Sequence, residues 1–179
     1  DFVDDACAAA LAAAAKAGKP RTILLSSGVF GRSVAPRLAV ALGSGLGSDA
    51  VALELDADKR LLVKRAAYAG NVTQKVLVKS PAGPELATVR PMAYPRASIN
   101  GSHGAVEKSP ADASAAKGRT RYASFAADAS SELDIGTAEK IVSGGRGLGD
   151  PKGFELIRAL AQAMGAAVGA SRAAVDSGW

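Results

Sequence analysis

Apolar and polar positions at the start of the chain follow a helical pattern and then a strand pattern. Residues 2–17 are rich in alanine and have high helix propensity. Gly18 and Pro20 come next, which indicates a glycine cap followed by a proline that cannot continue the helix. The short apolar run 22–25 then predicts a strand.

A second helix is predicted after a loop over residues 26–31. We expect Ser33 to cap this helix, Pro36 to lie in its first turn, and Gly43 to end it. Residues 51–55 predict another strand. The predicted buried face of the helix consists of Val34, Ala35, Leu38, Ala41 and Leu42. Strands alternating with helices are typical of an α/β layer with helices over a mainly parallel sheet.

Between residues 60 and 90 the pattern changes to short apolar runs separated by turn residues. The runs 61–63, 75–78 and 87–89 predict three strands, for which antiparallel pairing is plausible. Residues 1–96 are therefore interpreted as a partial N-terminal α/β domain.

Residues 97–137 are poor in large apolar side chains over most of their length. Such a segment cannot offset the entropy of ordering by burial, so we predict a poorly structured or extended linker. His103 lies in it, and a solvated loop histidine is a better interpretation than a catalytic one.

After the linker, the pattern predicts a strand, a glycine-rich loop, a helix and a second strand. The strand 139–142 enters the loop 143–149, which contains four glycines. Asp150 is expected to cap the following helix, with Pro151 at its first position. The predicted buried stripe of that helix is Phe154, Ile157, Leu160, Ala161 and Met164, before Gly165 ends it.

The second strand, residues 166–170, runs into Ser171 and Arg172. A strand–helix–strand unit of this kind joins parallel strands, so both strands should end on the same edge of one sheet. Arg146, in the glycine loop, should then lie near Ser171 and Arg172, where open α/β sheets bind ligands.

Taken alone, the loop is equally consistent with a tight strand-to-helix turn, because the spacing of Gly145, Gly147 and Gly149 is not the full dinucleotide pattern. With a second strand-end arginine beside it, a phosphate-bearing ligand is favoured, since glycines let the backbone approach an anion closely. The earlier loop over residues 28–32 has a similar outline, but without a matching polar pair from another strand end it is interpreted as a structural turn.

Composition excludes several classes of protein. The chain has 179 residues and a net charge of +5, yet the basic residues are not clustered and aromatic residues make up only 4%, which disfavours a nucleic-acid surface. Cys7 is the only cysteine, so neither a protein-ligated iron–sulfur cluster nor a zinc site is expected. No apolar run is long enough for a membrane-spanning helix, and an ordinary helix, not a secretory signal, is predicted at the start.

Several motifs together resemble the alpha subunit of electron transfer flavoproteins. They are residues 142–149 (Val-Ser-Gly-Gly-Arg-Gly-Leu-Gly), 169–179 (from Gly-Ala-Ser-Arg to Trp179), 31–39, 68–71 (Tyr-Ala-Gly-Asn) and 88–91 (Thr-Val-Arg-Pro). The resemblance implies two Rossmann-like α/β domains, of which the second, starting at residue 138, is incomplete, because later motifs of the family are missing.

In that family an alpha and a beta subunit form a heterodimer that holds FAD. The resemblance places the family's glycine-loop arginine at Arg146 and its Ser-Arg pair at Ser171 and Arg172, with Gly145 and Gly147 also against the cofactor. A guanidinium beside the flavin stabilises the negative charge that develops on reduction. No catalytic residue and no metal ligand are implied.

The resemblance also implies partners and a compartment. The carrier accepts electrons from acyl-CoA and related dehydrogenases and passes them to a quinone oxidoreductase, in a mitochondrial matrix or bacterial cytoplasm, as in fatty acid beta-oxidation.

Two alternative functions stay open. A nicotinamide-dependent oxidoreductase would need an acidic residue about 20 positions after the glycine loop, where none stands. An interaction module would keep the fold without cofactor chemistry.

Overall fold

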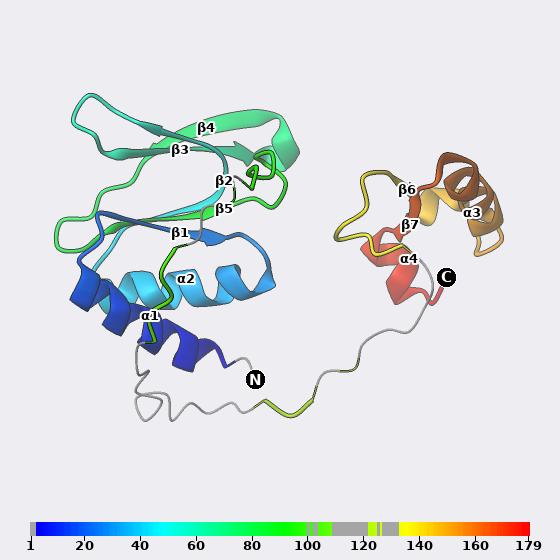
Figure 1. Cartoon of the computed structure of the whole chain (residues 1–179). Helices are drawn as coiled ribbons and strands as arrows, with labels where there is room; N and C mark the ends of the chain where they lie inside the picture. Colours follow the sequence, from blue (N-terminus) through cyan, green and yellow to red (C-terminus); the bar gives the residue numbers. More distant parts are fainter. Residues whose placement is uncertain (1–2, 100, 102–103, 109–121, 125, 127–132) are drawn as a thin grey trace. The chain divides into compact units, whose positions relative to one another are not determined.

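The computed structural model describes residues 3–99, 101, 104–108, 122–124, 126 and 133–179 (Figure 1). The chain divides into two compact units, residues 1–123 and 124–179, and each is described here by itself. More than half of the predicted linker, together with His103, lies outside the described residues.

The first unit is built on a five-stranded sheet. Its elements are α1 (Asp4–Gly18), β1 (Thr22–Ser26), α2 (Val29–Leu42), β2 (Leu46–Leu55), β3 (Leu61–Ala67), the 3₁₀ turn η1 (Tyr68–Gly70), β4 (Val72–Leu77) and β5 (Glu85–Val89). The strand order is β1-β5-β2-β3-β4. The expected α/β class is thus confirmed.

Strand direction divides this sheet into two parts. β5 pairs in parallel with β1 on one side and with β2 on the other, whereas β2, β3 and β4 are antiparallel neighbours. The expectation that β5 would belong to the antiparallel group is therefore wrong. β5 is almost entirely buried, as is usual for a central parallel strand covered on both faces.

Two core clusters lie on opposite faces of the sheet. On the helical face, α2 packs on the parallel strands and α1 packs on α2 (Figure 1), around Ala12, Leu38, Ala39 and Leu86. Ala87 follows Leu86 along β5 and points to the other face, where it packs with Ala50, Leu61, Val63 and Val78.

Both helices of the first unit differ from the expected boundaries. In α1, Gly18 is still helical and Lys19 takes the left-handed conformation (φ 46°), donating its N–H to the Ala15 carbonyl. α2 begins at Val29 after Gly28, so Ser33 is not its cap; the Ser33 hydroxyl instead donates to the Asp4 carboxylate. Pro36 consequently lies inside the helix, not in its first turn.

The end of α2 agrees with expectation, because Gly43 caps it in the left-handed conformation (φ 62°). Along its buried face, Ala39 is covered and the predicted Ala41 is exposed.

Gly31 explains the early start of the helix: a Cβ at this position would lie 1.6 Å from the Ser26 carbonyl oxygen. Only a residue without a side chain lets α2 follow β1 so closely.

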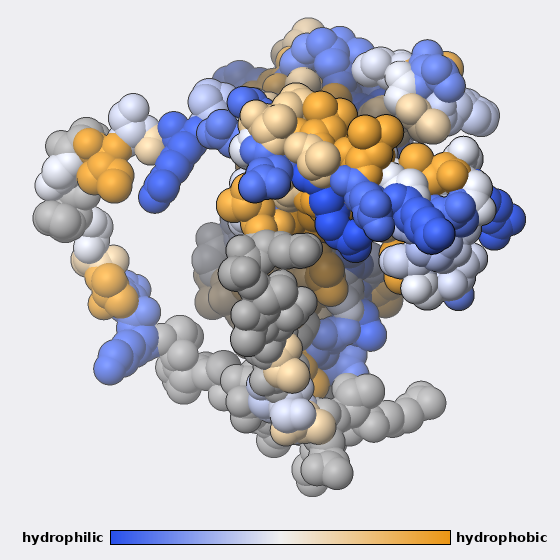
Figure 2. All heavy atoms as spheres, turned by 90° about the vertical axis from the view of Figure 1, so that its right-hand side faces the viewer, coloured by the Kyte–Doolittle hydropathy of each residue, from blue (hydrophilic) through white to orange (hydrophobic). Residues whose placement is uncertain are grey.

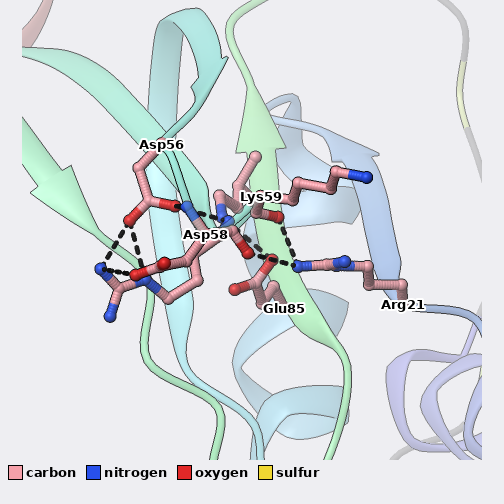
Figure 3. Close-up of polar contacts among 7 residues, drawn as sticks. Arg21, Asp56, Asp58, Lys59 and Glu85 are labelled. Carbon is pink, nitrogen blue, oxygen red and sulfur yellow. Dashed lines mark hydrogen bonds and ion pairs between the residues drawn. The ribbon is translucent and has the colours of Figure 1, made fainter.

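At the amino end of β5, polar contacts hold the turn between β2 and β3 (Figure 3). The Glu85 carboxylate is buried and accepts a hydrogen bond from the Leu61 N–H (3.0 Å), and Arg21 donates to the Lys59 carbonyl (2.5 Å). Within the turn, Arg60 pairs with Asp56. These contacts connect the antiparallel strands to the parallel ones.

The second unit contains a parallel pair of strands joined through a helix. Its elements are β6 (Ile141–Gly144), the 3₁₀ turn η3 (Arg146–Leu148), α3 (Gly153–Met164), β7 (Ala167–Ala170) and α4 (Arg172–Asp176). The predicted parallel strand–helix–strand unit is confirmed, and Gly165 ends α3 as expected.

The start and the buried face of α3 differ from the prediction. Asp150 does not cap the helix; its carboxylate accepts a hydrogen bond from the Lys152 N–H (2.7 Å) in a turn that also contains Pro151. Phe154 and Ala161 are buried, while Leu160 and Met164 of the predicted stripe are about half exposed. A two-stranded sheet is too narrow to cover a wider stripe of the helix.

Large apolar side chains remain on the surface of the described residues, and the face in Figure 2 carries apolar residues among hydrophilic ones. No helix among the residues described here has both the length and the apolar character to cross a membrane.

Candidate functional site

The carboxyl ends of β6 and β7 lie side by side. Gly144 pairs with Ala170 at the end of the register, and the Ser171 N–H donates a hydrogen bond to the Gly144 carbonyl (2.9 Å). The chain leaves β6 as Gly145 and Arg146, and leaves β7 as Ser171 and Arg172. The structure therefore brings together the two strand ends on which the sequence placed its candidate residues.

The glycines of this loop differ in what surrounds them. A Cβ on Gly144 would lie 2.7 Å from Leu148 and 3.0 Å from Phe154, so a side chain here would have to displace the side chains packed against it. A Cβ on Gly145 would lie 3.1 Å from the Ser171 hydroxyl, and Gly147 has open space around it. Gly145 thus adjoins the second strand end, whereas no packing within the described residues requires Gly147.

Ser171 is the residue before α4, and its carbonyl accepts hydrogen bonds from the Ala174 and Val175 N–H groups. Its side chain makes no capping hydrogen bond and is exposed. A serine at this position usually caps the helix through its hydroxyl. Here the hydroxyl keeps its capacity to bind another group.

The two arginines at this edge are exposed. Arg146 opens η3 and is exposed. The Arg172 side chain is 94% exposed, and its Nε lies 3.5 Å from the Asp176 carboxylate one turn later in α4. Such a solvent-exposed pair is weak, so the Arg172 guanidinium can exchange this partner for a ligand at little cost.

A second group of polar residues lies at the carboxyl ends of β1 and β5 in the first unit. Asp49, from an irregular part of β2, accepts hydrogen bonds from Arg90 through Nε (3.2 Å) and Nη2 (2.6 Å). The Asp49 N–H donates to the Thr88 hydroxyl (2.8 Å). Asp49 and Thr88, together with Ser27 and Arg32, line a hollow of about 330 Å³.

Asp49 of β2 and Thr88 of β5 line the same hollow as Arg32 of the loop over residues 28–32. The interpretation of this loop as a structural turn agrees with Gly31, where a Cβ would clash with the Ser26 carbonyl oxygen. Arg90 holds the pKa of Asp49 below its usual range, with smaller contributions from the Ser27 hydroxyl and the Arg32 charge. Little in the sequence indicated this residue, because the apolar pattern predicted a strand that starts at residue 51, whereas β2 starts at Leu46 and includes Asp49.

Among the described residues, no group of three or more His, Cys, Asp or Glu side chains is arranged to hold a metal ion. Cys7 is free and partly buried.

Two family models match the chain. Residues 1–114 match the electron transfer flavoprotein domain, and residues 134–179 match the electron transfer flavoprotein FAD-binding domain. The second match covers the paired strand ends of β6 and β7.

Curated relatives match nearly the whole chain. An electron transfer flavoprotein subunit alpha from Thermoanaerobacterium thermosaccharolyticum is 39% identical over all of this chain and 54% of its own length. One from Syntrophomonas wolfei is 40% identical over 90% of this chain and 50% of its own length. A probable mitochondrial one from Cryptococcus neoformans is 35% identical over 96% of this chain and 49% of its own length.

The chain thus spans about half the length of these curated relatives. The first family model alone covers more than half of the chain, and the relatives named above are alpha subunits. The chain therefore belongs to the electron transfer flavoprotein family and corresponds to part of its alpha subunit.

Proposed function

We propose that this chain is part of an FAD-dependent electron carrier and that its strand ends at β6 and β7 hold part of the cofactor. The observation that supports this is the hydrogen bond from the Ser171 N–H to the Gly144 carbonyl, which joins the two strand ends. Open α/β sheets bind ligands at this edge. Residues 138–179 are, on this proposal, the beginning of the FAD-binding domain.

The residues at this edge have the chemistry that FAD requires. Arg146 and Arg172 are exposed cations, the Ser171 hydroxyl makes no capping bond, and Gly145 leaves its backbone accessible. Gly147, with open space around it, is proposed to let the cofactor approach the loop.

When bound, FAD supplies the capacity to take up and release electrons. The protein's part is to bind it and to set its potential. The guanidiniums of Arg146 and Arg172 would stabilise negative charge on the bound ligand, because each is a cation with several N–H donors. The Ser171 hydroxyl donates or accepts one hydrogen bond and fixes the orientation of the ligand.

We further propose the partners that the family assignment favours. A beta subunit completes a heterodimer, acyl-CoA and related dehydrogenases donate the electrons, and a quinone oxidoreductase receives them. The chain acts as a carrier and not as an enzyme in its own right, within a bacterial cytoplasm or a mitochondrial matrix.

The absorption spectrum of the protein, purified from its natural gene with its beta subunit, tests the function. Flavin bands that bleach when an acyl-CoA dehydrogenase and its substrate are added support the carrier. Bound nicotinamide without flavin supports the oxidoreductase alternative, and a folded, colourless heterodimer supports an interaction module. Either of the last two results overturns the proposal.

Replacement of Arg172 tests the site in the same preparation. Arg172→Ala should weaken FAD binding about tenfold, corresponding to about 1.4 kcal/mol, and lower the reduction potential of the FAD that remains bound. Arg158→Ala, which removes an arginine stacked over Phe154 on α3, is the charge-matched control and should leave both quantities unchanged. Equal behaviour of the two variants would contradict the assignment of Arg172.

A further inference from the structure

A second hollow in the first unit lies beside the Asp49–Arg90 pair. It has a volume of about 480 Å³ and is lined by Arg65, Tyr68, Gln74, Arg90 and the small residues between them. This volume is within the usual range for small-molecule sites. The described lining carries two guanidinium groups and no carboxylate. We call it the Arg65–Arg90 hollow.

The sheet register explains why the two arginines line the same hollow. Arg65 of β3 is the register partner of Ala50 in β2, and the Arg90 N–H donates to the Ala50 carbonyl (2.9 Å). Gln74 of β4 lies directly opposite Arg65, on the same face of the sheet. β3, β4 and the residue that follows β5 therefore each contribute one polar side chain to the lining of this hollow.

The charges of the two arginines are compensated unequally. The Asp49 carboxylate pairs with Arg90. Arg65 forms no ion pair with any described residue; its Nη1 donates to the neutral Ser48 hydroxyl (3.0 Å), and its Nε is buried without a hydrogen-bond partner. A buried N–H of a charged group that lacks a partner is costly. An oxyanion in the hollow would supply the negative charge that the Arg65 guanidinium lacks among the described residues.

The loop that closes the hollow is strained. Tyr68, Ala69 and Gly70 all have positive φ angles (49°, 55° and 91°), and two of them carry a Cβ. Asn71 holds the loop by donating from its side chain to the Tyr68 carbonyl (2.9 Å). A positive φ is unfavourable for Tyr68 and Ala69, which carry a Cβ, and such residues are concentrated at ligand sites.

Arg65 has no ion pair among the described residues, Arg90 lines the same hollow while it is paired with Asp49, and the wall contains two strained residues. From these observations we propose that the Arg65–Arg90 hollow binds the phosphate or carboxylate group of a small molecule. Two planar guanidiniums suit such oxyanions because each offers several N–H donors in a fixed geometry. The site lies in the first unit and uses none of the residues proposed to hold FAD.

Titration of the chain with inorganic phosphate and, separately, with acetate tests the proposal. Binding is followed by the shifts of backbone amide resonances at constant ionic strength, so that general screening does not change. One of the two anions should give saturable shifts at Arg65, Gln74 and Asn71 below about 10 mM, a weak but specific affinity. Whichever anion binds identifies the ligand group.

The variants distinguish the site from general attraction to a basic protein. Arg65→Gln should weaken binding at least tenfold, and Arg65→Lys, which keeps the charge but loses the fork, should also weaken it. Arg21→Gln removes the same charge at the opposite edge of the sheet and should have no effect. Unfolding transitions of the variants establish that they are folded.

Three results would overturn the proposal. They are the absence of saturable binding for both anions, equal binding by Arg65→Gln and the unaltered chain, and equal weakening by Arg21→Gln. Because Arg65→Gln leaves Arg146, Ser171 and Arg172 intact, FAD binding by this variant in the heterodimer should not change. Loss of the anion site and loss of the FAD site are therefore separable.

Discussion

The two units use the same strand–loop–helix connection but differ in how much of it is covered. In the first unit, α2 lies over three parallel strands and under α1, and Leu38 is completely buried. In the second, α3 lies over two short strands, and Leu160 is 48% exposed. The comparison separates what a strand–loop–helix motif specifies by itself from what the surrounding layers add.

The largest expected difference between the two units is in the free energy of unfolding that is lost when a leucine of α2 or α3 is shortened to alanine. Leu38→Ala should lower the free energy of unfolding of the first unit by about 3 kcal/mol, because it opens a cavity in a closed core. Leu160→Ala removes the same atoms from a half-exposed position and should cost about 1 kcal/mol or less. Urea unfolding followed by circular dichroism measures both. Equal losses would mean that the coverage of the two helices is not different in solution.

This contrast explains part of what the sequence could predict. Apolar runs and helix-ending glycines located β1, β3 and β7 and the ends of α2 and α3, because those signals are local. The buried stripe of α3 was predicted too wide, since a helical period says which residues share a face and not how many strands cover them.

Signals that depend on distant residues were missed. Ser33 looked like a cap, but its hydroxyl binds Asp4, 29 residues earlier in the chain. β5 looked like part of an antiparallel group, but its partners are β1 and β2. The two sites differ in the same way. The pairing of Gly144 with Ala170 followed from a strand–helix–strand motif that is local in the sequence. Arg65 and Arg90 line one hollow only because of the register of the sheet, which the sequence pattern does not give.

The glycines of the two loops provide the next comparison. Gly31→Ala would place a Cβ 1.6 Å from the Ser26 carbonyl oxygen, so the first unit should lose about 2 kcal/mol of stability or more. Gly147→Ala meets nothing within 4 Å and should change stability by less than about 0.5 kcal/mol. If Gly147 adjoins FAD, however, the same substitution should weaken FAD binding. Unchanged stability with unchanged FAD affinity would remove Gly147 from the proposed site.

Acid titration should distinguish the units because the first one contains a carboxyl group, Asp49 of β2, whose pKa is depressed by its pairing with Arg90 at the end of β5. Arg90 lowers the pKa of Asp49 in the folded state. The stabilisation is therefore present above the unfolded pKa of about 3.9 and is lost as the pH falls through the lower folded value.

Asp49→Asn keeps a side chain that tolerates the left-handed conformation found at this position (φ 60°) but removes the charge. At neutral pH it should cost about 1 kcal/mol or less, because the pair is partly exposed. The cost should shrink as the pH falls below about 4. A cost that stays constant from pH 7 to pH 2 would show that the charge of Asp49 contributes nothing.

The smallest expected effect on stability belongs to Asp176, in the second unit. Its pair with Arg172 is exposed and 3.5 Å long, so Asp176→Asn should change the free energy of unfolding by less than about 0.5 kcal/mol. The effect on the cofactor should be different. If Arg172 leaves Asp176 to contact FAD, removal of this competing charge should leave FAD binding in the heterodimer as tight as before, or tighter. Weaker FAD binding by Asp176→Asn would mean that Asp176 holds Arg172 in its binding position. The Asp176 carboxylate would then be part of the proposed FAD site at the carboxyl ends of β6 and β7.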